Sequence, residues 1–173
     1  MDEAEARAWS ILTTGIYILT TRGDGRGHGM SASWVTQCSA NPPLLAAAVG
    51  RSSYSHGWIL SQGIFGLNVV GQRSKKLQDY FHSAAARRAG NLDQVEWFWS
   101  PRGVPWLPLA LLCLECCVVQ AISVGDRTLF VASVSARRWG EPDVPLTSHD
   151  LPYVFVGEVR PAMRRHSRFL GWS

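Results

Sequence analysis

Residues 30–39 form a ten-residue stretch without charge, in which small hydroxyl side chains alternate with other types. Successive side chains of a β-strand point to opposite faces. One face would hold Ser31, Ser33, Val35, Gln37 and Ser39, and the other Met30, Ala32, Trp34, Thr36 and Cys38. Such a strand suits close approach and hydrogen bonding by a flat polar heteroaromatic ring such as an isoalloxazine. The alternative is that the serines line a small tapered barrel or a subunit contact, and the strand taken alone favours this alternative.

Residues 50–56 gather a cation, hydroxyls and a histidine just before a short helix that we expect over residues 57–61. The members that matter are Gly50, Arg51, Ser52, Ser53, Ser55 and His56. The first N–H groups of a helix lack partners within it, and its dipole makes this end positive, so an anion is favoured there. Ordinary capping by Ser52 or Ser53 would explain one serine but not the whole cluster. The sequence therefore predicts a phosphate-binding loop.

A single short strand, expected over residues 44–49, joins the two segments. It follows a tight connection at Asn41-Pro42-Pro43, which must interrupt any ladder. The ring-binding strand and the phosphate-binding loop could therefore lie within the length of one mononucleotide. Together they indicate flavin mononucleotide (FMN) more strongly than either does alone.

The elements around these segments read as mostly antiparallel strands with short helices. Expected strands cover residues 15–21, 30–39, 44–49, 65–70, 110–122 and 128–136, and expected helices cover residues 3–12, 57–61 and a segment capped by Ser74. A glycine-rich turn at residues 22–29 and a second turn at residues 125–127 predict hairpins, whereas residues 82–108 look irregular. This pattern favours a β-barrel decorated by helices over a doubly wound parallel sheet.

Composition bounds the class of protein. The chain has 173 residues, 46% of them hydrophobic and 17% charged, with a net charge of +4; its mean hydropathy is −0.01. These values exclude disorder and fit one domain over residues 1–173, with a core at about residues 9–153. We expect a cytoplasmic protein without membrane segments, because no apolar stretch is long enough to span a bilayer and the N-terminus resembles no leader. We expect the basic tail at residues 160–173 to be exposed to solvent. Because the sequence contains no nucleic-acid-binding motif, we expect no nucleic acid as a partner.

Cysteines and tryptophans add two further expectations. Cys113 and Cys117 would share one face of a strand and Cys116 the other, which is poor geometry for a zinc or iron–sulfur site, so we predict no metal. Buried thiols in a reducing compartment are the better account. Trp97, Trp99 and Trp106 fall in a proline-bearing segment that we expect to pack on something, such as another subunit.

The order of these motifs resembles the flavin reductase-like FMN-binding split-barrel family. The resemblance covers roughly residues 9–153, and the order of the motifs carries it more than any one of them does. Its landmarks are residues 15–21, 29–39, 42–44, 52–56, 65–70, 77–81, 114–116, 125–130 and 145–149. The family implies a mainly β fold, an antiparallel Greek-key split β-barrel with a few short helices. It also implies a homodimer with FMN near the dimer interface.

The resemblance also implies roles for individual residues. The isoalloxazine and ribityl chain would contact Ser31, Ala32, Ser33, Trp34, Val35 and Thr36; the phosphate would lie on Gly50, Arg51, Ser52, Ser53, Ser55 and His56; Phe81 and His82 would close the site. No protein side chain would be catalytic, because the cofactor carries the chemistry. The implied reaction is hydride transfer from NAD(P)H to flavin, with FAD as an alternative flavin and a monooxygenase or another electron acceptor as partner.

Two departures from the family pattern leave the redox partner open. Arg127 stands where the family commonly has histidine, and Ser133 where it often has glutamate. Arg127 could favour an acidic substrate or be a surface substitution. One alternative function is therefore an electron-carrier flavoprotein without nicotinamide activity, and a more remote one is a binding module that has lost its flavin. His149 matches a late family histidine, although a lone histidine is more often a structural hydrogen-bond partner.

Overall fold

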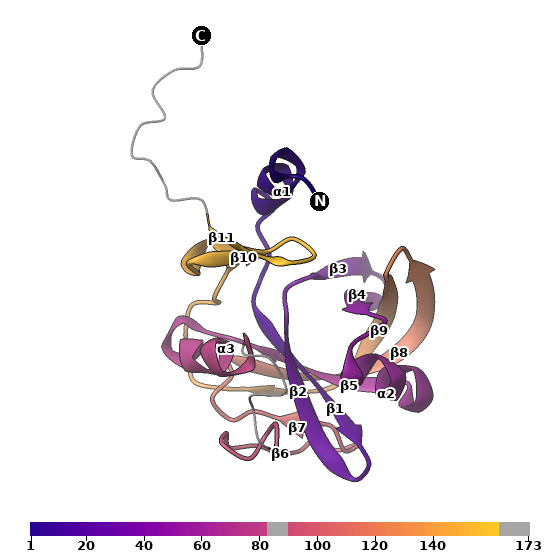
Figure 1. Ribbon diagram of the computed structural model, residues 1–173. Helices are drawn as coiled ribbons and strands as arrows, with labels where there is room; N and C mark the ends of the chain where they lie inside the picture. Colours follow the sequence, from indigo (N-terminus) through magenta and orange to yellow (C-terminus); the bar gives the residue numbers. More distant parts are fainter. Residues whose placement is uncertain (83–89, 163–173) are drawn as a thin grey trace. The chain divides into compact units, whose positions relative to one another are not determined.

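The computed structural model describes residues 1–82 and 90–162. The chain divides into two compact units. Residues 15–146 form the larger unit, and residues 1–14 together with the segment from Thr147 onward form the smaller one (Figure 1). Within the described residues, no helix is both long and apolar enough to cross a bilayer.

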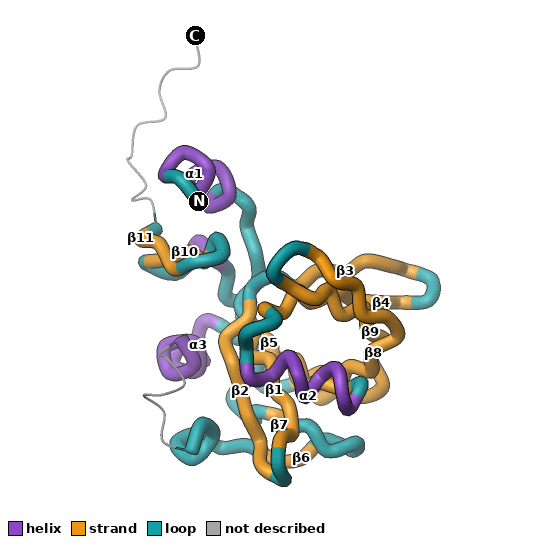
Figure 2. The backbone as a smooth tube through the Cα atoms, turned by 45° about the vertical axis from the view of Figure 1, so that its right-hand side comes forward, coloured by secondary structure: helices purple, strands orange, loops and turns teal. Residues whose placement is uncertain are grey.

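The larger unit is built on one sheet of seven antiparallel strands. In the order β2-β1-β5-β8-β9-β4-β3, the strands are β2 (Arg26–Ala32), β1 (Tyr17–Gly23), β5 (Ile64–Val69), β8 (Leu112–Val124), β9 (Arg127–Trp139), β4 (Pro43–Gly50) and β3 (Val35–Ala40). Every neighbouring pair is antiparallel. Figure 2 shows the strands curling around a common interior. The prediction of a mainly β, antiparallel architecture is confirmed.

Large apolar side chains fill the interior of this sheet. Leu19, Phe65 and Phe130 are fully buried and belong to one core cluster with Leu45, Ala47, Val49, Ile59, Leu67, Cys116 and Ala132. These residues come from β1, β4, β5, β8, β9 and α2 (Tyr54–Gln62), so one core fixes both ends of β4. Because β4 leads directly into residues 50–56, the core also fixes where that loop begins.

The prediction of one strand over residues 30–39 is wrong. β2 ends at Ala32 and pairs with β1, whereas β3 begins at Val35 and pairs with β4. Between them the Val35 N–H donates to the Ser33 carbonyl at 3.0 Å, a tight turn that takes Ser33 and Trp34 out of both ladders. Ala32 and Val35 consequently both pack against the core, which strict alternation would have placed on opposite faces.

Two short helices lie against β1 and β2. α2 and α3 (Lys75–His82) both pack there, and α3 follows a 3₁₀ turn, η1 (Gln72–Ser74). The predicted start of a helix after Ser74 is confirmed, although the Ser74 hydroxyl accepts from Gly71 N–H at 2.9 Å rather than from α3. The expected irregular stretch at residues 82–108 contains a small hairpin, β6 (Phe98–Trp99) with β7 (Pro105–Trp106), and Trp106 is buried.

The smaller unit has its own cluster of buried side chains. It contains α1 (Glu3–Ser10), the 3₁₀ turn η3 (Ser148–Asp150) and a hairpin of β10 (Tyr153–Phe155) with β11 (Val159–Pro161). Ala6, Val154 and Val156 form its core. His149 Nε2 lies 2.6 Å from Thr13 Oγ1, a structural hydrogen bond. The predicted basic tail at residues 160–173 lies outside the described residues from 163 onward.

Candidate functional site

The predicted phosphate loop leads into α2, which begins at Tyr54, three residues earlier than expected. Ser53 is its N-cap residue, has an extended backbone, and its side chain makes no capping hydrogen bond. Ser53 Oγ is nevertheless buried, and the described parts of the chain offer it no hydrogen-bond partner. An unsatisfied buried hydroxyl costs about 1–3 kcal/mol, so such a group at a helix N-terminus points to a ligand that accepts its hydrogen bond.

Arg51 supplies a positive charge beside this helix end. Its side chain donates to Ser123 Oγ at 3.0 Å and to the Gly125 carbonyl, and its backbone N–H donates to the Asp126 carbonyl. These bonds hold the exposed side chain against the turn between β8 and β9. Because a guanidinium has five N–H donors, these two side-chain bonds leave donors for an anion.

Other members of the predicted loop make hydrogen bonds within the protein. Ser55 is fully buried, and its Oγ lies 3.2 Å from His28 Nδ1. His56 Nε2 lies 2.8 Å from Thr128 Oγ1, and its ring lies 5.7 Å from that of Phe130. Ser52 is exposed at the loop surface. The loop thus divides into an outer group (Arg51, Ser52, Ser53) and an inner pair (Ser55, His56) that fastens α2 to the sheet.

Arg127 lies between the predicted ring strand and the predicted phosphate loop. Its guanidinium carbon lies 4.2 Å from the centroid of the Trp34 ring, a cation–π contact. Its Nη1 lies 4.0 Å from the point that a Cβ on Gly50 would occupy. Burial lowers the pKa of Arg127, and the nearby Asp126 carboxylate opposes this shift. Sequence comparison with the family pattern singled out Arg127 but gave no reason to expect this contact.

The remaining residues of the predicted ring strand point in several directions. Ser31 Oγ donates to Gln78 Oε1 on α3 at 2.7 Å, Ala32 and Val35 pack on the core, and Thr36 is exposed. Ser33 and Trp34 occupy the turn between β2 and β3. Trp34 is linked to the predicted phosphate loop through Arg127, which stacks on its ring and pairs with Gly50 between β9 and β4.

Phe81 and His82, predicted to close the site, end α3 with different environments. Phe81 is buried, and a Cβ on Gly29 would lie 2.6 Å from its Cε1 atom. Glycine at position 29 is therefore what allows the Phe81 ring to lie against β2. His82 is exposed.

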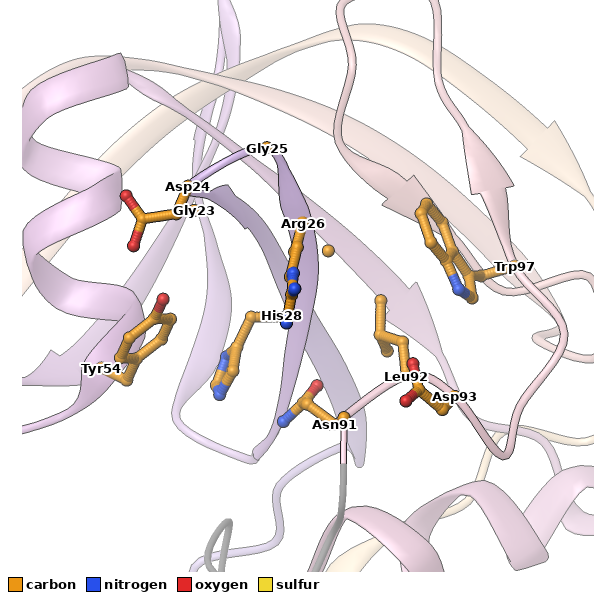
Figure 3. Close-up of a pocket in the computed structure, with 12 residues that line it drawn as sticks. Gly23, Asp24, Gly25, Arg26, His28, Tyr54, Asn91, Leu92, Asp93 and Trp97 are labelled. Carbon is orange, nitrogen blue, oxygen red and sulfur yellow. The ribbon is translucent and has the colours of Figure 1, made fainter.

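A pocket of about 850 Å³ opens beside the hairpin of β1 and β2 (Figure 3). Its walls come from residues 23–28, Tyr54 and residues 90–93, and from Trp97. Tyr54 is the first residue of α2, so the pocket borders the predicted phosphate loop. Sequence reasoning treated residues 22–29 only as a turn and missed this pocket, because its walls are far apart along the chain.

The cysteines form no metal site within the described ranges 1–82 and 90–162. Burial raises the pKa of the Cys113 thiol to about 11, and burial together with the neighbouring Cys117 and Glu115 raises that of Cys116 further. Protonated thiols of this kind are poor nucleophiles and poor metal ligands. Cys38, on β3, is exposed.

We expect one thiol to react rapidly with Ellman's reagent at pH 8 in the native protein. Exposure makes Cys38 that thiol, because Cys113 and Cys116 are buried and protonated. Cys117 is only partly exposed, and its Sγ accepts a hydrogen bond from Arg102 Nη1 at 3.2 Å. The measurement is the stoichiometry of the fast phase in wild type and in Cys38→Ser. Loss of the fast phase in the variant supports the assignment, and any fast-reacting thiol that remains in Cys38→Ser contradicts it.

Comparisons with known proteins agree with this architecture. The model of the "Flavin reductase like domain" family matches residues 9–158. The reductase component of an FADH(2)-dependent resorcinol hydroxylase from Rhizobium sp. is 30% identical over 131 residues, which cover 76% of this chain and 73% of that protein. An NADPH-flavin oxidoreductase from Streptomyces viridifaciens is 31% identical over 86% of this chain and 79% of its own.

A solved structure of a flavin reductase has a similar fold. The styrene monooxygenase flavin reductase from Pseudomonas putida S12 superposes with a TM-score of 0.71 at 29% identity, over 82% of this chain and 90% of that one. The fold class predicted from the sequence, a mainly β antiparallel split barrel with short helices, is thereby confirmed. The chain belongs to the flavin reductase-like family.

Proposed function

We propose that this protein is an NAD(P)H:flavin oxidoreductase that binds FMN, with FAD as the alternative flavin. The observation that carries the proposal is the buried Ser53 hydroxyl without a partner among the described residues, at the N-terminus of α2 and two residues from Arg51. A helix N-terminus, a spare hydroxyl and a cation together suit a phosphate group. Membership of the flavin reductase-like family supports a flavin nucleotide as the ligand that carries this phosphate group.

The chain's own residues would bind and orient the flavin. Ser52, Ser53, Arg51 and the first N–H groups of α2 would hold the ribityl phosphate. Trp34 and Arg127 lie beside this loop and would border the ring system. When bound, the flavin supplies the hydride chemistry. The protein then has to position the two ring systems and exclude water, and no side chain needs to act as a nucleophile.

We propose a homodimer that passes reducing equivalents to a separate acceptor. Val119, Ile122 and Val124 of β8 and Val134 of β9 are exposed apolar side chains on one hairpin, which suits burial against a second copy. The Rhizobium relative is named as the reductase component of a hydroxylase. This supports a monooxygenase or a similar oxidative enzyme as the acceptor here.

A visible absorption spectrum tests the proposal. The purified protein is scanned before and after addition of FMN, and then after NADH and NADPH under anaerobic conditions. Flavin bands that bleach on nicotinamide addition support the reductase and give the preferred nucleotide. Bands that persist until dithionite is added identify an electron carrier instead, and a protein that takes up no flavin contradicts the proposal.

A further inference from the structure

The pocket beside the β1–β2 hairpin is lined by the edge of a strand. β2 is the terminal strand of the seven-stranded sheet, so one of its sides carries no further strand. At Gly29 that side is occupied by the side-chain amide of Asn91. Gly29 N–H donates to Asn91 Oδ1 at 2.6 Å, and Asn91 Nδ2 donates to the Gly29 carbonyl at 3.0 Å. A flat group with a neighbouring donor and acceptor thus pairs with this edge.

Gly27 presents the same pair of backbone groups to the pocket. In an antiparallel ladder, residues two apart direct their N–H and C=O groups to the same side. Because Gly29 directs its groups away from β1, Gly27 does so as well, and Gly27 lines the pocket. Glycine is needed there, since a Cβ would lie 2.5 Å from Leu92 and 3.5 Å from the Trp97 ring. The pocket wall therefore has a donor and an acceptor beside an aromatic ring.

Aromatic rings flank this edge on two sides (Figure 3). Trp97 is partly buried and is braced by Trp99, whose ring meets it edge-on at 4.7 Å. Tyr54 is 54% exposed, and its ring lies 4.6 Å from that of His28. A planar base that hydrogen-bonds to the strand edge would have Trp97 beside it to stack on.

Among the described residues that line the pocket, the charged groups are one arginine and two carboxylates. Arg26 is exposed at the start of β2, and Asp24 and Asp93 lie on opposite sides of it in Figure 3. A guanidinium suits one phosphate group. Carboxylates accept hydrogen bonds from ribose hydroxyls and repel further phosphates. This combination fits a nucleoside monophosphate better than a polyphosphate.

We propose that this pocket binds the adenylate half of a dinucleotide. Adenine carries an amino donor next to a ring-nitrogen acceptor, the same arrangement with which the Asn91 amide pairs with Gly29. Trp97 stacks on the base, Arg26 binds the phosphate, and Asp24 or Asp93 accepts from the ribose. Tyr54 lines the pocket and directly follows Ser53, so the pocket borders the candidate phosphate loop, and we therefore favour FAD as the dinucleotide. Only this choice of FAD as the source rests on the proposed function.

Binding measurements on Trp97→Ala test the pocket. We expect the dissociation constant of FAD to rise about tenfold, the loss typical of one stacking contact, while that of FMN changes less than twofold. Flavin fluorescence titration gives both constants, and 5′-AMP titrated calorimetrically gives the adenylate alone. Trp97→Phe keeps a stacking ring and should restore most of the FAD affinity. Trp139→Ala, a change at a tryptophan that is 67% exposed and outside the pocket lining, is the matched control.

The outcomes separate the two sources of adenylate and the two proposals. Weaker FAD and AMP binding with unchanged FMN binding assigns the pocket to the flavin. NADH is titrated calorimetrically in the same way as 5′-AMP, and weaker AMP and NADH binding with unchanged FAD binding assigns the pocket to the nicotinamide nucleotide. Unchanged AMP binding, or equal losses for FMN and FAD, overturns the pocket assignment. A wild-type protein that binds AMP through Trp97 but neither flavin overturns the proposed function and leaves the pocket assignment standing.

Discussion

Replacing Glu115 with alanine is expected to lower the free energy of unfolding by about 3–5 kcal/mol. Glu115 lies in β8 with only 1% of its surface exposed. Its carboxylate accepts hydrogen bonds from Ser100 Oγ at 2.5 Å, Arg102 N–H at 2.7 Å and Ser135 Oγ at 2.6 Å. Alanine would leave these three donors without their acceptor and release the β6–β7 loop from the sheet. Urea denaturation followed by tryptophan fluorescence measures the loss.

The pH dependence identifies the carboxylate as the cause. Burial alone would raise the pKa of Glu115, but hydrogen bonds from Ser100, Ser135 and the Arg102 N–H outweigh it and hold the pKa below its ordinary value. The unfolded chain therefore binds this proton more readily than the folded protein does. The carboxylate's contribution is complete above the unfolded pKa of about 4.3 and is lost as the pH falls through the lower folded value.

Glu115→Gln is the matched control, because it keeps the shape and removes the charge. The stability gap between wild type and Glu115→Gln should be largest near pH 7 and shrink below about pH 4. A gap that stays constant down to pH 3 would show that shape and not charge holds the loop. Wild-type stability in Glu115→Ala would contradict the whole account.

The antiparallel sheet could be predicted because its signals are local. The turn predicted at residues 22–29 and the turn at residues 125–127 each stand between predicted strands, and each belongs to a hairpin in the structure, although β2 already begins at Arg26. The break at Ser33 and Trp34 carries no such signal, since the residues on both sides are uncharged and fit a strand equally well. What separates β2 from β3 is that one pairs with β1 and the other with β4. That difference arises only when the sheet curls.

In the candidate site, too, the features formed by neighbouring residues could be predicted, whereas the contacts between distant segments could not. Arg51, Ser52 and Ser53 are neighbours in sequence, so their clustering before a helix was visible there. Ser55 and His56 belong to the same run, yet their partners are His28 and Thr128, which sequence spacing does not reveal. The adenylate pocket was missed for the same physical reason. Its strand edge, its amide and its stacking ring come from three separate segments, and no local pattern joins them.

Arg51→Ala is expected to weaken FMN binding by about 1–3 kcal/mol, or roughly 5- to 150-fold in the dissociation constant. The Arg51 guanidinium is held beside the N-terminus of α2 by Ser123 Oγ and the Gly125 carbonyl. Its position is thus fixed before a ligand arrives, so little side-chain entropy is lost when it binds a phosphate. Fluorescence titration of FMN, compared with riboflavin, measures the effect. Riboflavin lacks the phosphate, and its affinity should be the same in both proteins.

Two control variants separate charge from loop structure. Ser123→Ala removes one bond that holds Arg51 but leaves the cation, so FMN affinity should fall far less than in Arg51→Ala. Arg51→Lys keeps the charge without the planar fork and should recover part of the loss. If Arg51→Ala weakens riboflavin and FMN equally, the arginine acts by shaping the loop and the turn between β8 and β9. If neither affinity changes, Arg51 does not bind the phosphate. Ser53 is then the residue to replace next, because its buried hydroxyl at the N-terminus of α2 would bind a phosphate independently of Arg51.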